Sequence, residues 1–479
     1  MKKLFYQTAE FDKNAVKNGL SELVLQENAA GKIARLVRKK LPKGAVVLAL
    51  CGKGNNAADA AACVRMLHGR FECRILKLED DVNQNCRTQM LIARNFGVKI
   101  FESNSNLDKL FKKADCVIDG VFGSGLKGVV SEKFNEVLRL ANKAKGLKVA
   151  VDVPSGLNAD GVGVGEVFKA DFTVSMGALK LGLFSDFAKD FVGKVKVARL
   201  GVEEKVFTTQ KEAEQSWCQA ANGKENACGK ITQNECDWLV ELKDLELPKR
   251  EAKSSHKGDF GHAFVIGGRM SGAANLCGEA ALRIGAGRVS LVGVEARSLS
   301  LMQKEDLRGA SCVSVGSGLG DAEVDLRLAL ELPAVVDADM FSRQEIWAFA
   351  DSQKAVLTPH PKEFATLLGT SVEEVQARRF ELAREFSRKC QATLVLKGAN
   401  TIIANNGCLS VVACGTPSLA KGGSGDVLSG VILGLLAQGY SPQKAAVQGV
   451  LAHAAAARKW RGKARAMRAE DLLENLAFI

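Results

Sequence analysis

One glycine-rich turn in the chain places a carboxylate beside space for a phosphate. Gly422, Gly423 and Gly425 precede Asp426, and the apolar run 427–437 that follows is typical of a buried helix. The first amides of such a helix can stabilise an anion. An aspartate there can cap the helix, or it can accept the proton of a hydroxyl that attacks a phosphate. Because the glycines leave room for a phosphoryl group, we favour the second role for Asp426.

A second group of polar turns could hold a phosphate or a cation. The turn Cys51-Gly-Lys-Gly-Asn-Asn56 leads into an alanine-rich helix, a pattern that suits an anion but is also common without one. Asp119 precedes a Gly-Ser-Gly turn, and Asp152 begins the segment Asp-Val-Pro-Ser155. Oxygens of Asn, Asp and Ser side chains are ligands that hard cations prefer. These three segments are therefore candidates for one shared site.

Short apolar runs alternate with helix-length segments and must position these turns. The runs are 46–51, 114–119 and 147–153 in the first half, and 262–268, 288–294, 311–318, 333–339, 355–360 and 392–398 in the second, with a helix expected over 371–389. This alternation is typical of parallel strands joined by helical crossovers. Because ligands of such sheets bind at the carboxyl ends of strands, the three polar segments of the first half should converge on one pocket.

The chain divides into two α/β domains. Its 479 residues exceed what one core usually supports, and polar residues dominate the stretch 202–251. We predict one domain over 1–205, a linker or extension over 206–245 and a second domain over 246–479. Trp217 and Trp238 could attach the extension to a domain surface.

Composition excludes several classes of protein. Hydrophobic residues make up 47% and charged residues 25%, which is typical of a packed globular chain. We see no export signal and no apolar run of bilayer length, so we expect a cytoplasmic protein away from membranes. The 13 cysteines contain no CxxC pair and are expected to be reduced, and the five scattered histidines do not suggest zinc. The net charge of +12 favours anionic partners, but dispersed basic residues and 6% aromatics do not favour nucleic acid.

Residues 1–205 resemble the NAD(P)H-hydrate epimerase family in four segments: YQTAEFDKNAV with LQENAA, CGKGNN with Asp59, IDGVFGSGL and VDVPSGL. The resemblance implies a Rossmann-like, three-layer αβα domain that interconverts the R and S hydrates of NADH and NADPH and binds potassium. It implies Asn56, Asp119 and Ser155 as potassium ligands. The implied contacts to the hydrated dinucleotide are Asn55, Asn56, Ala57, Ala58, Asp59, Gly123, Ser124, Gly125, Leu126, Lys127, Gly128, Val129 and Asp152, and we assign proton transfer to Asp152.

This chain departs from the family at Ala57, Ala58 and Ala60, where glycines are usual. If the glycines serve positive φ angles or close backbone approach, the methyl groups would obstruct the ligand. If these residues are already helical, each alanine stabilises the helix by up to about 1 kcal/mol. We favour the helical alternative.

Residues 250–440 resemble ribokinase-like enzymes, and within them the ADP/ATP-dependent NAD(P)H-hydrate dehydratases. The similarity covers His256–His262, Thr358–Glu363, Leu396–Thr401 and the turn before Asp426. It implies a three-layer αβα domain that uses Mg²⁺ with ADP or ATP. The implied nucleotide contacts are Lys397, Gly398, Ala399, Asn400, Thr401 and Gly425, and the implied hydrate contacts are Gly318, His360 and Asp426. His360, which stands between two prolines, could instead be a turn residue.

The two resemblances together indicate repair of hydrated nicotinamide cofactors. A nucleotide would phosphorylate the ring hydroxyl of the S hydrate, and elimination of phosphate would restore NADH or NADPH. Two alternatives remain: a small-molecule kinase fused to a non-catalytic dinucleotide-binding module, and a protein that binds nucleotides or RNA. The fusion favours repair, because its two activities together act on both hydrates. We expect a homo-oligomer. The sequence does not decide whether ADP or ATP is the nucleotide, or whether the hydrate of NADH or of NADPH is the preferred substrate.

Overall fold

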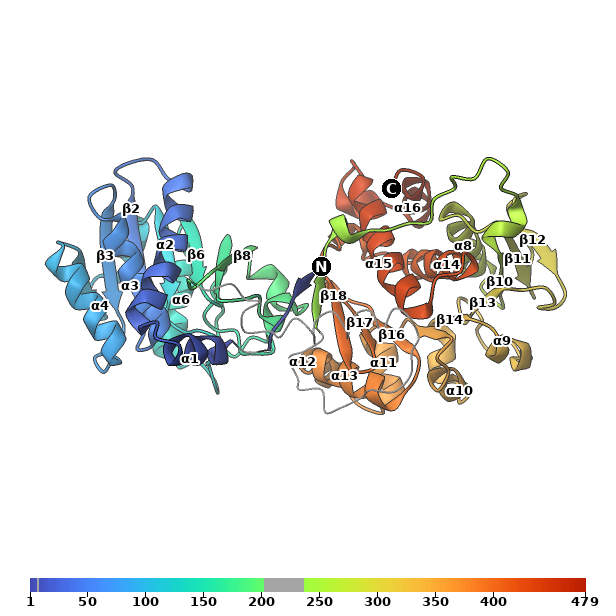
Figure 1. Ribbon diagram of the computed structural model, residues 1–479, viewed down its shortest axis with the longest axis horizontal. Coiled ribbons are helices and arrows are strands. Elements are labelled where there is room, and N and C mark those ends of the chain that lie inside the picture. The colour runs from blue at the N-terminus through green and yellow to red at the C-terminus, as the bar shows by residue number, and fades with distance from the viewer. Residues whose placement is uncertain (7, 202–236) are drawn as a thin grey trace. The chain divides into compact units, whose positions relative to one another are not determined.

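The structure is a computed structural model that describes residues 1–6, 8–201 and 237–479 (Figure 1). These residues form two compact units. One comprises residues 3–201, and the other comprises residues 237–479 together with Met1 and Lys2. Each unit has its own sheet and its own hydrophobic core.

The N-terminal unit is built on a seven-stranded parallel sheet in the order β4-β3-β2-β5-β6-β7-β8. Its strands are β2 (Val46–Cys51), β3 (Glu72–Lys77), β4 (Lys99–Glu102), β5 (Cys116–Gly120), β6 (Leu147–Val151), β7 (Phe172–Met176) and β8 (Lys194–Ala198). The chain order reverses between β2 and β5, which is the position where open parallel sheets bind ligands. The three polar turns follow β2, β5 and β6, which are neighbours in this sheet.

Helices cover both faces of this sheet (Figure 1). They are α1 (Ala9–Lys17), α2 (Glu22–Lys40), α3 (Asn55–Leu67), α4 (Gln84–Asn95), α5 (Leu107–Lys112) and α6 (Glu132–Lys143), with the short 3-10 helices η1 (Leu181–Phe184) and η2 (Ala188–Asp190). Side chains alternate along β2: Val47 and Ala49 pack with α2, α3 and α4, whereas Leu48 and Leu50 pack with α5 and α6. The predicted three-layer αβα arrangement is therefore confirmed.

The C-terminal unit has an eleven-stranded sheet in the order β1-β9-β18-β17-β16-β15-β14-β13-β10-β11-β12. The strands are β1 (Lys2–Lys3), β9 (Trp238–Val240), β10 (His262–Ile266), β11 (Arg288–Val292), β12 (Met302–Lys304), β13 (Cys312–Val315), β14 (Ala334–Val336), β15 (Ala355–Leu357), β16 (Thr393–Leu396), β17 (Thr401–Asn405) and β18 (Cys408–Val412). Strands β10 to β16 pair in parallel, and β17 is antiparallel to both neighbours. The chain order reverses between β10 and β13.

One face of this sheet is covered by the apolar helices α8 (Ser271–Arg283), α14 (Ser424–Ala437), α15 (Pro442–Lys459) and α16 (Ala469–Leu476), which share a core with Val265, Val335 and Val395. On the other face lie α10 (Ile346–Ala350), α11 (Pro361–Leu368), α12 (Val372–Ala377) and α13 (Arg379–Lys389) (Figure 1). Shorter elements are α9 (Arg327–Glu331), η4 (Leu242–Asp244), η5 (Lys257–Phe260), η6 (Ala338–Ser342), η7 (Pro417–Leu419) and η8 (Ala464–Ala466). Because α14 is apolar on nearly all sides, it is the central helix of its layer.

The structure differs from the predicted organisation at the edge of the second unit. Residues 237–245 belong to this unit rather than to a linker, because β9 pairs with β18 in its sheet and the buried Asp237 forms a 2.5 Å ion pair with Arg384. The N-terminal ammonium of Met1 lies 2.6 Å from Asp244 Oδ1 and so belongs to this unit as well. Trp217 and most of the predicted linker lie outside the described residues.

The structure also tests the expectations about one helix, the cysteines and membrane-spanning segments. The helix expected over 371–389 is interrupted at Arg378, which separates α12 from α13. Buried cysteines such as Cys51 and Cys312 carry free thiols, but Cys408 is disulfide-bonded, so the prediction of reduced thiols is wrong at that residue. Among the described helices, none combines the length and apolar character needed to cross a bilayer.

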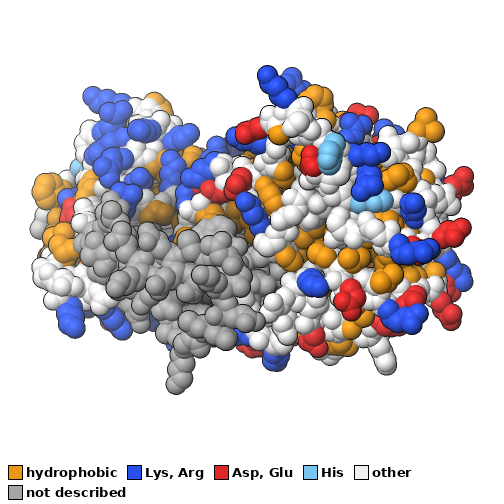
Figure 2. Space-filling model, turned by 45° about the vertical axis from the view of Figure 1, so that its right-hand side comes forward, with side chains coloured by type: hydrophobic (Ala, Val, Ile, Leu, Met, Phe, Trp, Pro, Cys, Tyr) orange, Lys and Arg blue, Asp and Glu red, His pale blue; other side chains and the backbone are white. Residues whose placement is uncertain are grey.

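Positive charge is less evenly dispersed than the sequence suggested. On the face shown in Figure 2, Lys and Arg side chains gather on part of the N-terminal unit, whereas on the C-terminal unit they alternate with Asp and Glu. The last turn of α2 contributes Arg38, Lys39 and Lys40 to the basic side chains of the first unit. The expectation of dispersed charge therefore holds better for the second unit.

The stability of the C-terminal unit should depend on the close contact of α14 with α8. A Cβ atom on Gly430 would lie 2.1 Å from the Cys277 carbonyl oxygen, so Gly430→Ala must push the helices apart. We expect a loss of about 1–3 kcal/mol in the free energy of unfolding, measured by calorimetry on the full chain. Gly31→Ala is the control, since nothing lies within 4 Å of its Cβ position in α2; it should raise the stability of the other unit by about 0.5–1 kcal/mol. A Gly430→Ala chain as stable as the parent would contradict the packing.

Candidate functional sites

The three predicted potassium ligands meet at the carboxyl ends of β2, β5 and β6. Asn56, in the first turn of α3, donates its side-chain N–H groups to the carbonyls of Phe122 (2.9 Å) and Val151 (2.8 Å). The Ser155 hydroxyl donates to Asp119 Oδ1 at 2.6 Å, and the Ser155 amide donates to Asp119 Oδ2 at 2.8 Å. The structure thus brings together side chains that are up to 99 positions apart in the sequence, as the fold class required.

Asp119 is a buried carboxylate whose negative charge is not balanced by a positive charge among the described residues. It is fully buried, and this burial raises its pKa to about 6 against the hydrogen bonds from Ser155 and Val121. Among the described residues, no salt bridge involves Asp119. A Cβ atom on Gly123 would lie 2.7 Å from Asn56 Oδ1, so a glycine is needed where the next loop approaches. Carboxylate, hydroxyl, amide and carbonyl oxygens around a buried negative charge fit a hard cation.

Asp152 is held in a strained conformation directly after β6. Its φ angle is 67°, which is unfavourable for a residue with a side chain. Oδ1 accepts hydrogen bonds from the ammonium of Lys180 and from the Met176 amide at 3.0 Å, whereas Oδ2 faces the Ser124 amide at 3.5 Å. One carboxylate oxygen is therefore anchored and the other faces the glycine loop.

Lys180 was not predicted from the sequence. It is almost fully buried, and its ammonium also donates to the Met176 carbonyl at 3.1 Å. A lysine in the apolar segment SMGALKLGLF was the available signal, because a buried ammonium requires a partner.

A cavity of about 520 Å³ opens in the same unit and is lined by Asn55, Asp59, Asp12 and Met176, among others. Burial, with the charges of Asp152 and Asp12 next, raises the pKa of Asp59 well above its usual value. Asp12 lies in the motif used for the resemblance, yet its place at this cavity was not predicted. Acidic groups of the first unit therefore gather around the Lys180–Asp152 pair.

The structure corrects part of the predicted substrate contacts. Ala57 and Ala58 are fully buried inside α3 and have no surface to offer a ligand. With Ala60 they are helical and without positive φ, which confirms the helical alternative for these three positions. The loop after β5 is open: Gly125, Lys127, Gly128 and Val129 are exposed, and Gly123, Ser124 and Leu126 are partly exposed.

Asp426 lies in the first turn of α14, in the C-terminal unit. The N-cap of this helix is Gly423, with φ 85°, so Asp426 is not the N-cap residue. It lines a cavity of about 380 Å³ with Met270, Gly422 and Arg468, among others. Burial, followed by the negative charge of Asp337, raises the pKa of Asp426 to about 6. A carboxylate of this pKa beside helix amides is suited to accept a proton near neutral pH.

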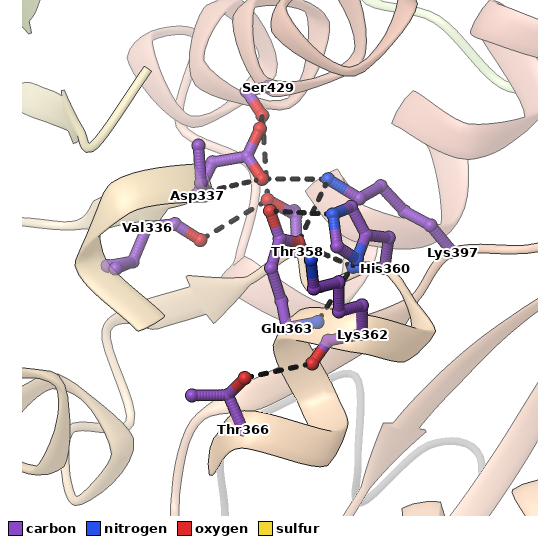
Figure 3. Close-up of polar contacts among 10 residues, drawn as sticks. Val336, Asp337, Thr358, His360, Lys362, Glu363, Thr366, Lys397 and Ser429 are labelled. Carbon is purple, nitrogen blue, oxygen red and sulfur yellow. Dashed lines mark hydrogen bonds and ion pairs between the residues drawn. The ribbon is translucent and has the colours of Figure 1, made fainter. Parts of the chain in front are cut away.

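Lys397 connects this turn to two further carboxylates (Figure 3). Its ammonium lies 2.8 Å from Asp337 Oδ1 and 3.7 Å from Glu363 Oε2. The Ser429 hydroxyl of α14 donates to Asp337 Oδ2 at 2.7 Å. Burial alone would raise the pKa of Asp337, but Lys397 and these hydrogen bonds hold it below its usual value. A Cβ atom on Gly425 would lie 3.5 Å from the Lys397 ammonium, so this charge faces the first turn of α14.

His360 caps α11, in agreement with the turn alternative. Its Nδ1 accepts from the Glu363 amide at 3.1 Å, and its own amide donates to Glu363 Oε2 at 2.6 Å. The imidazole Nε2 lies 3.3 Å from Glu363 Oε1, and the side chain is 47% exposed. His360 therefore joins the Lys397 network through Glu363 while its ring stays accessible, and its predicted contact with the hydrate remains a prediction.

The other predicted residues of this unit differ in accessibility. Gly398 and Ala399 are exposed in the loop before β17 and Thr401 is partly exposed, whereas Asn400 is buried and offers almost no surface. Arg379 donates to the carbonyls of Lys397 and Asn400, both at 3.3 Å, and so holds this loop. Gly318 is also buried. Its φ is 67° and a Cβ atom would lie 2.4 Å from the Met270 carbonyl oxygen, so Gly318 permits close packing behind the cavity wall.

Asp337, Glu363, Ser429 and Arg379 were not assigned from the sequence. Asp337 ends an apolar run and Glu363 closes the segment Thr358–Glu363, so both stood within recognised motifs. Their partnership with Lys397 gave no local signal, because 60 residues separate Asp337 from Lys397.

Comparisons with known proteins match both units. Residues 22–182 match the family described as YjeF-related protein N-terminus, and residues 263–477 match the family described as NAD(P)H-hydrate dehydratase. The crystal structure of ADP/ATP-dependent NAD(P)H-hydrate dehydratase from Bacillus subtilis co-crystallized with ATP/Mg²⁺ is 30% identical and covers 49% of this chain and 93% of that chain, with a TM-score of 0.42.

Relatives also match across both units. The bifunctional NAD(P)H-hydrate repair enzyme Nnr of Helicobacter pylori is 37% identical over 99% of each chain. The Escherichia coli protein of the same name is 33% identical over 96% of this chain and 89% of its own length. Since these matches run through both units in the same order, the chain belongs to the family of bifunctional NAD(P)H-hydrate repair enzymes.

Proposed function

We propose that the chain repairs hydrated nicotinamide cofactors through the two sites described above. The N-terminal unit interconverts the R and S hydrates of NADH and NADPH, and the C-terminal unit dehydrates the S form with ADP or ATP. The observation that carries the proposal is the position of Asp426, which lines a cavity at the mouth of α14 with the Lys397 ammonium beside the same turn.

In the C-terminal unit, Asp426 accepts the proton of the ring hydroxyl while that oxygen attacks the terminal phosphorus of the nucleotide. A new P–O bond forms to the ring oxygen, and the bond to the nucleotide leaving group breaks. The amides of the first turn of α14 stabilise the charge on the transferring group. The ring C–O bond then breaks with loss of phosphate and of a proton from the adjacent ring carbon, which restores the dihydronicotinamide.

The carboxylates of Asp337 and Glu363 suit the magnesium ion that nucleotide phosphates bring with them. Mg²⁺ is usually held by one or two carboxylates together with phosphate oxygens and water. When bound, it neutralises phosphate charge. The exposed Gly398 and Ala399 are the part of the predicted nucleotide loop that is open to a ligand.

In the N-terminal unit, Asp152 moves the proton that epimerisation requires, and Lys180 anchors it as a positioning residue. Asn56, Asp119 and Ser155 would hold potassium, whose charge would compensate the buried carboxylate of Asp119. The resemblance alone supports two further parts of the proposal, a homo-oligomeric state and a cytoplasmic location. Gel filtration and cell fractionation test these two.

Incubation of the chain with mixed hydrates, ADP, Mg²⁺ and K⁺ tests the proposed function as a whole. We expect full recovery of dihydronicotinamide absorbance, because epimerisation supplies the S form. Recovery that stops when the S form is consumed would remove the epimerase activity. A stable phosphorylated product would instead favour a small-molecule kinase.

Asp426→Asn should lower the rate of nucleotide-dependent dehydration by about 10²–10⁴-fold, because it removes the proton acceptor. Binding of ADP, measured by calorimetry, should change little. Asp351→Asn, at an exposed position in the same unit, is the control and should keep normal turnover. Near-normal dehydration by Asp426→Asn would exclude this residue from the mechanism.

The acid limb of dehydration should report the raised pKa of Asp426. Its value of about 6 means that the carboxylate is protonated, and cannot accept a proton, as the pH falls through about 6. We therefore expect kcat/KM for the S hydrate to be about half-maximal near pH 6, to decline below it and to approach a plateau at about pH 7. A profile that stays flat down to the usual pKa of an aspartate would contradict the assigned environment.

Lys180→Met should lower kcat for epimerisation by about 10²-fold, because Asp152 loses its anchor, while KM changes little. Dehydration of purified S hydrate by the same chain is the internal control and should be unchanged. Lys180→Met leaves the buried charge of Asp152 unpaired and could therefore destabilise the fold. The double variant Lys180→Met, Asp152→Asn removes that charge as well. Its free energy of unfolding should equal that of the parent, while epimerisation should remain inactive. Normal epimerisation by a folded Lys180→Met chain would refute the role.

A further inference from the structure

The ammonium of Lys397 occupies the space between two acidic side chains of the C-terminal unit. It contacts Asp337 Oδ1 at 2.8 Å and lies 3.7 Å from Glu363 Oε2. Figure 3 shows Lys397 and Ser429 directed at the Asp337 carboxylate from different elements. Asp337 is almost fully buried and Glu363 mostly buried, so water provides little screening here. The lysine therefore acts as the local counter-ion of both acids.

The charges around Lys397 do not balance. Asp337, Glu363 and Asp426 all interact electrostatically with this one ammonium, and the nearby His360 adds positive charge only when protonated. These three carboxylates and the one ammonium carry a net negative charge when all the acids are ionised. Burial and the charge of Asp337 raise the pKa of both Asp426 and Glu363, as expected for such an excess.

We propose that Lys397 is the resident counter-ion of Asp337 and Glu363 in the nucleotide-free chain, and that a divalent cation enters between these acids only together with a nucleotide. This inference rests on the proposed nucleotide site and deepens it. A cation that arrived alone would face the ammonium at the same two carboxylates and would leave it buried without a partner. A phosphate group provides that partner, so phosphate and metal bind cooperatively.

The geometry allows Lys397 to change partner without movement of its backbone. Its amide donates to the Pro359 carbonyl at 2.9 Å, and its carbonyl accepts from Arg379 at 3.3 Å, which keeps the main chain in place. Gly425 has no side chain in the space next to the ammonium. A phosphate at the first turn of α14 would therefore lie within reach of the lysine side chain.

The binding of Mn²⁺ alone to the full chain tests the inference, with bound metal followed by electron paramagnetic resonance. Without nucleotide, Lys397→Met should bind Mn²⁺ at least about tenfold more tightly than the parent, because the competing charge is gone. Lys397→Arg is the matched control; it keeps the charge and should bind as weakly as the parent. Adding Asp337→Asn to Lys397→Met should abolish the gain.

Two results would overturn the inference: equal Mn²⁺ affinity of the parent and Lys397→Met, or a gain that persists after Asp337→Asn. If Lys397→Met does not fold, the parent provides the test. Saturating AMP, whose phosphate can pair with Lys397, should then tighten Mn²⁺ binding, and unchanged affinity would contradict the coupling. No hydrate is present in these titrations, so failure of cofactor repair is observed separately, in the absorbance assay.

Discussion

Buried carboxylates that lack sufficient positive charge are the feature on which both sites depend. Asp119 in the N-terminal unit is fully buried and, within the described part of the chain, is compensated by hydrogen bonds alone. Asp337 and Asp426 in the C-terminal unit share one ammonium. Taking a carboxylate out of water is costly unless a cation or dipole compensates it. Sites with such carboxylates therefore favour the binding of cations, or of anions that bind together with cations. This property is shared by the proposed potassium site of one unit and the proposed metal–nucleotide site of the other.

Parallel-sheet topology explains why these carboxylates gather. In the first unit the strand order reverses between β2 and β5. Asn56 at the start of α3, Asp119 near the end of β5 and Ser155 after β6 meet near this point. In the second unit the reversal lies between β10 and β13. Met270, which follows β10, packs against Gly318, which follows β13, and Met270 lines the Asp426 cavity. The two units therefore use the same edge of the sheet, where strand ends release the backbone to turn toward a ligand.

Close helix packing connects the core to the chemistry of the second unit. Gly430 and Gly434 bring α14 against the backbone of α8, and the first turn of α14 carries Asp426. His453 Nε2 of α15 lies 2.9 Å from the carbonyl oxygen of Ser424, the first residue of α14, and this contact helps to fix the beginning of α14. The first unit uses small residues in a similar way, since a Cβ atom on Gly120 would lie 2.6 Å from the Ala60 methyl group. Small residues thus let α14 pack closely on α8 in the second unit and α3 pack closely on β5 in the first.

The sequence alone determined the α/β class, most of the parallel strands and the polar turns at their ends, because strand periodicity and glycine-rich turns are local properties of the chain. It did not reveal β3, β4, β7 and β8 of the first sheet, nor β1, β9, β12, β17 and β18 of the second. Only the tertiary structure paired Lys180 with Asp152 and Lys397 with Asp337, since those partners lie in segments that follow different strands. It also decided that Ala57 and Ala58 are buried, because the side of α3 that faces the sheet depends on packing rather than on sequence near the turn.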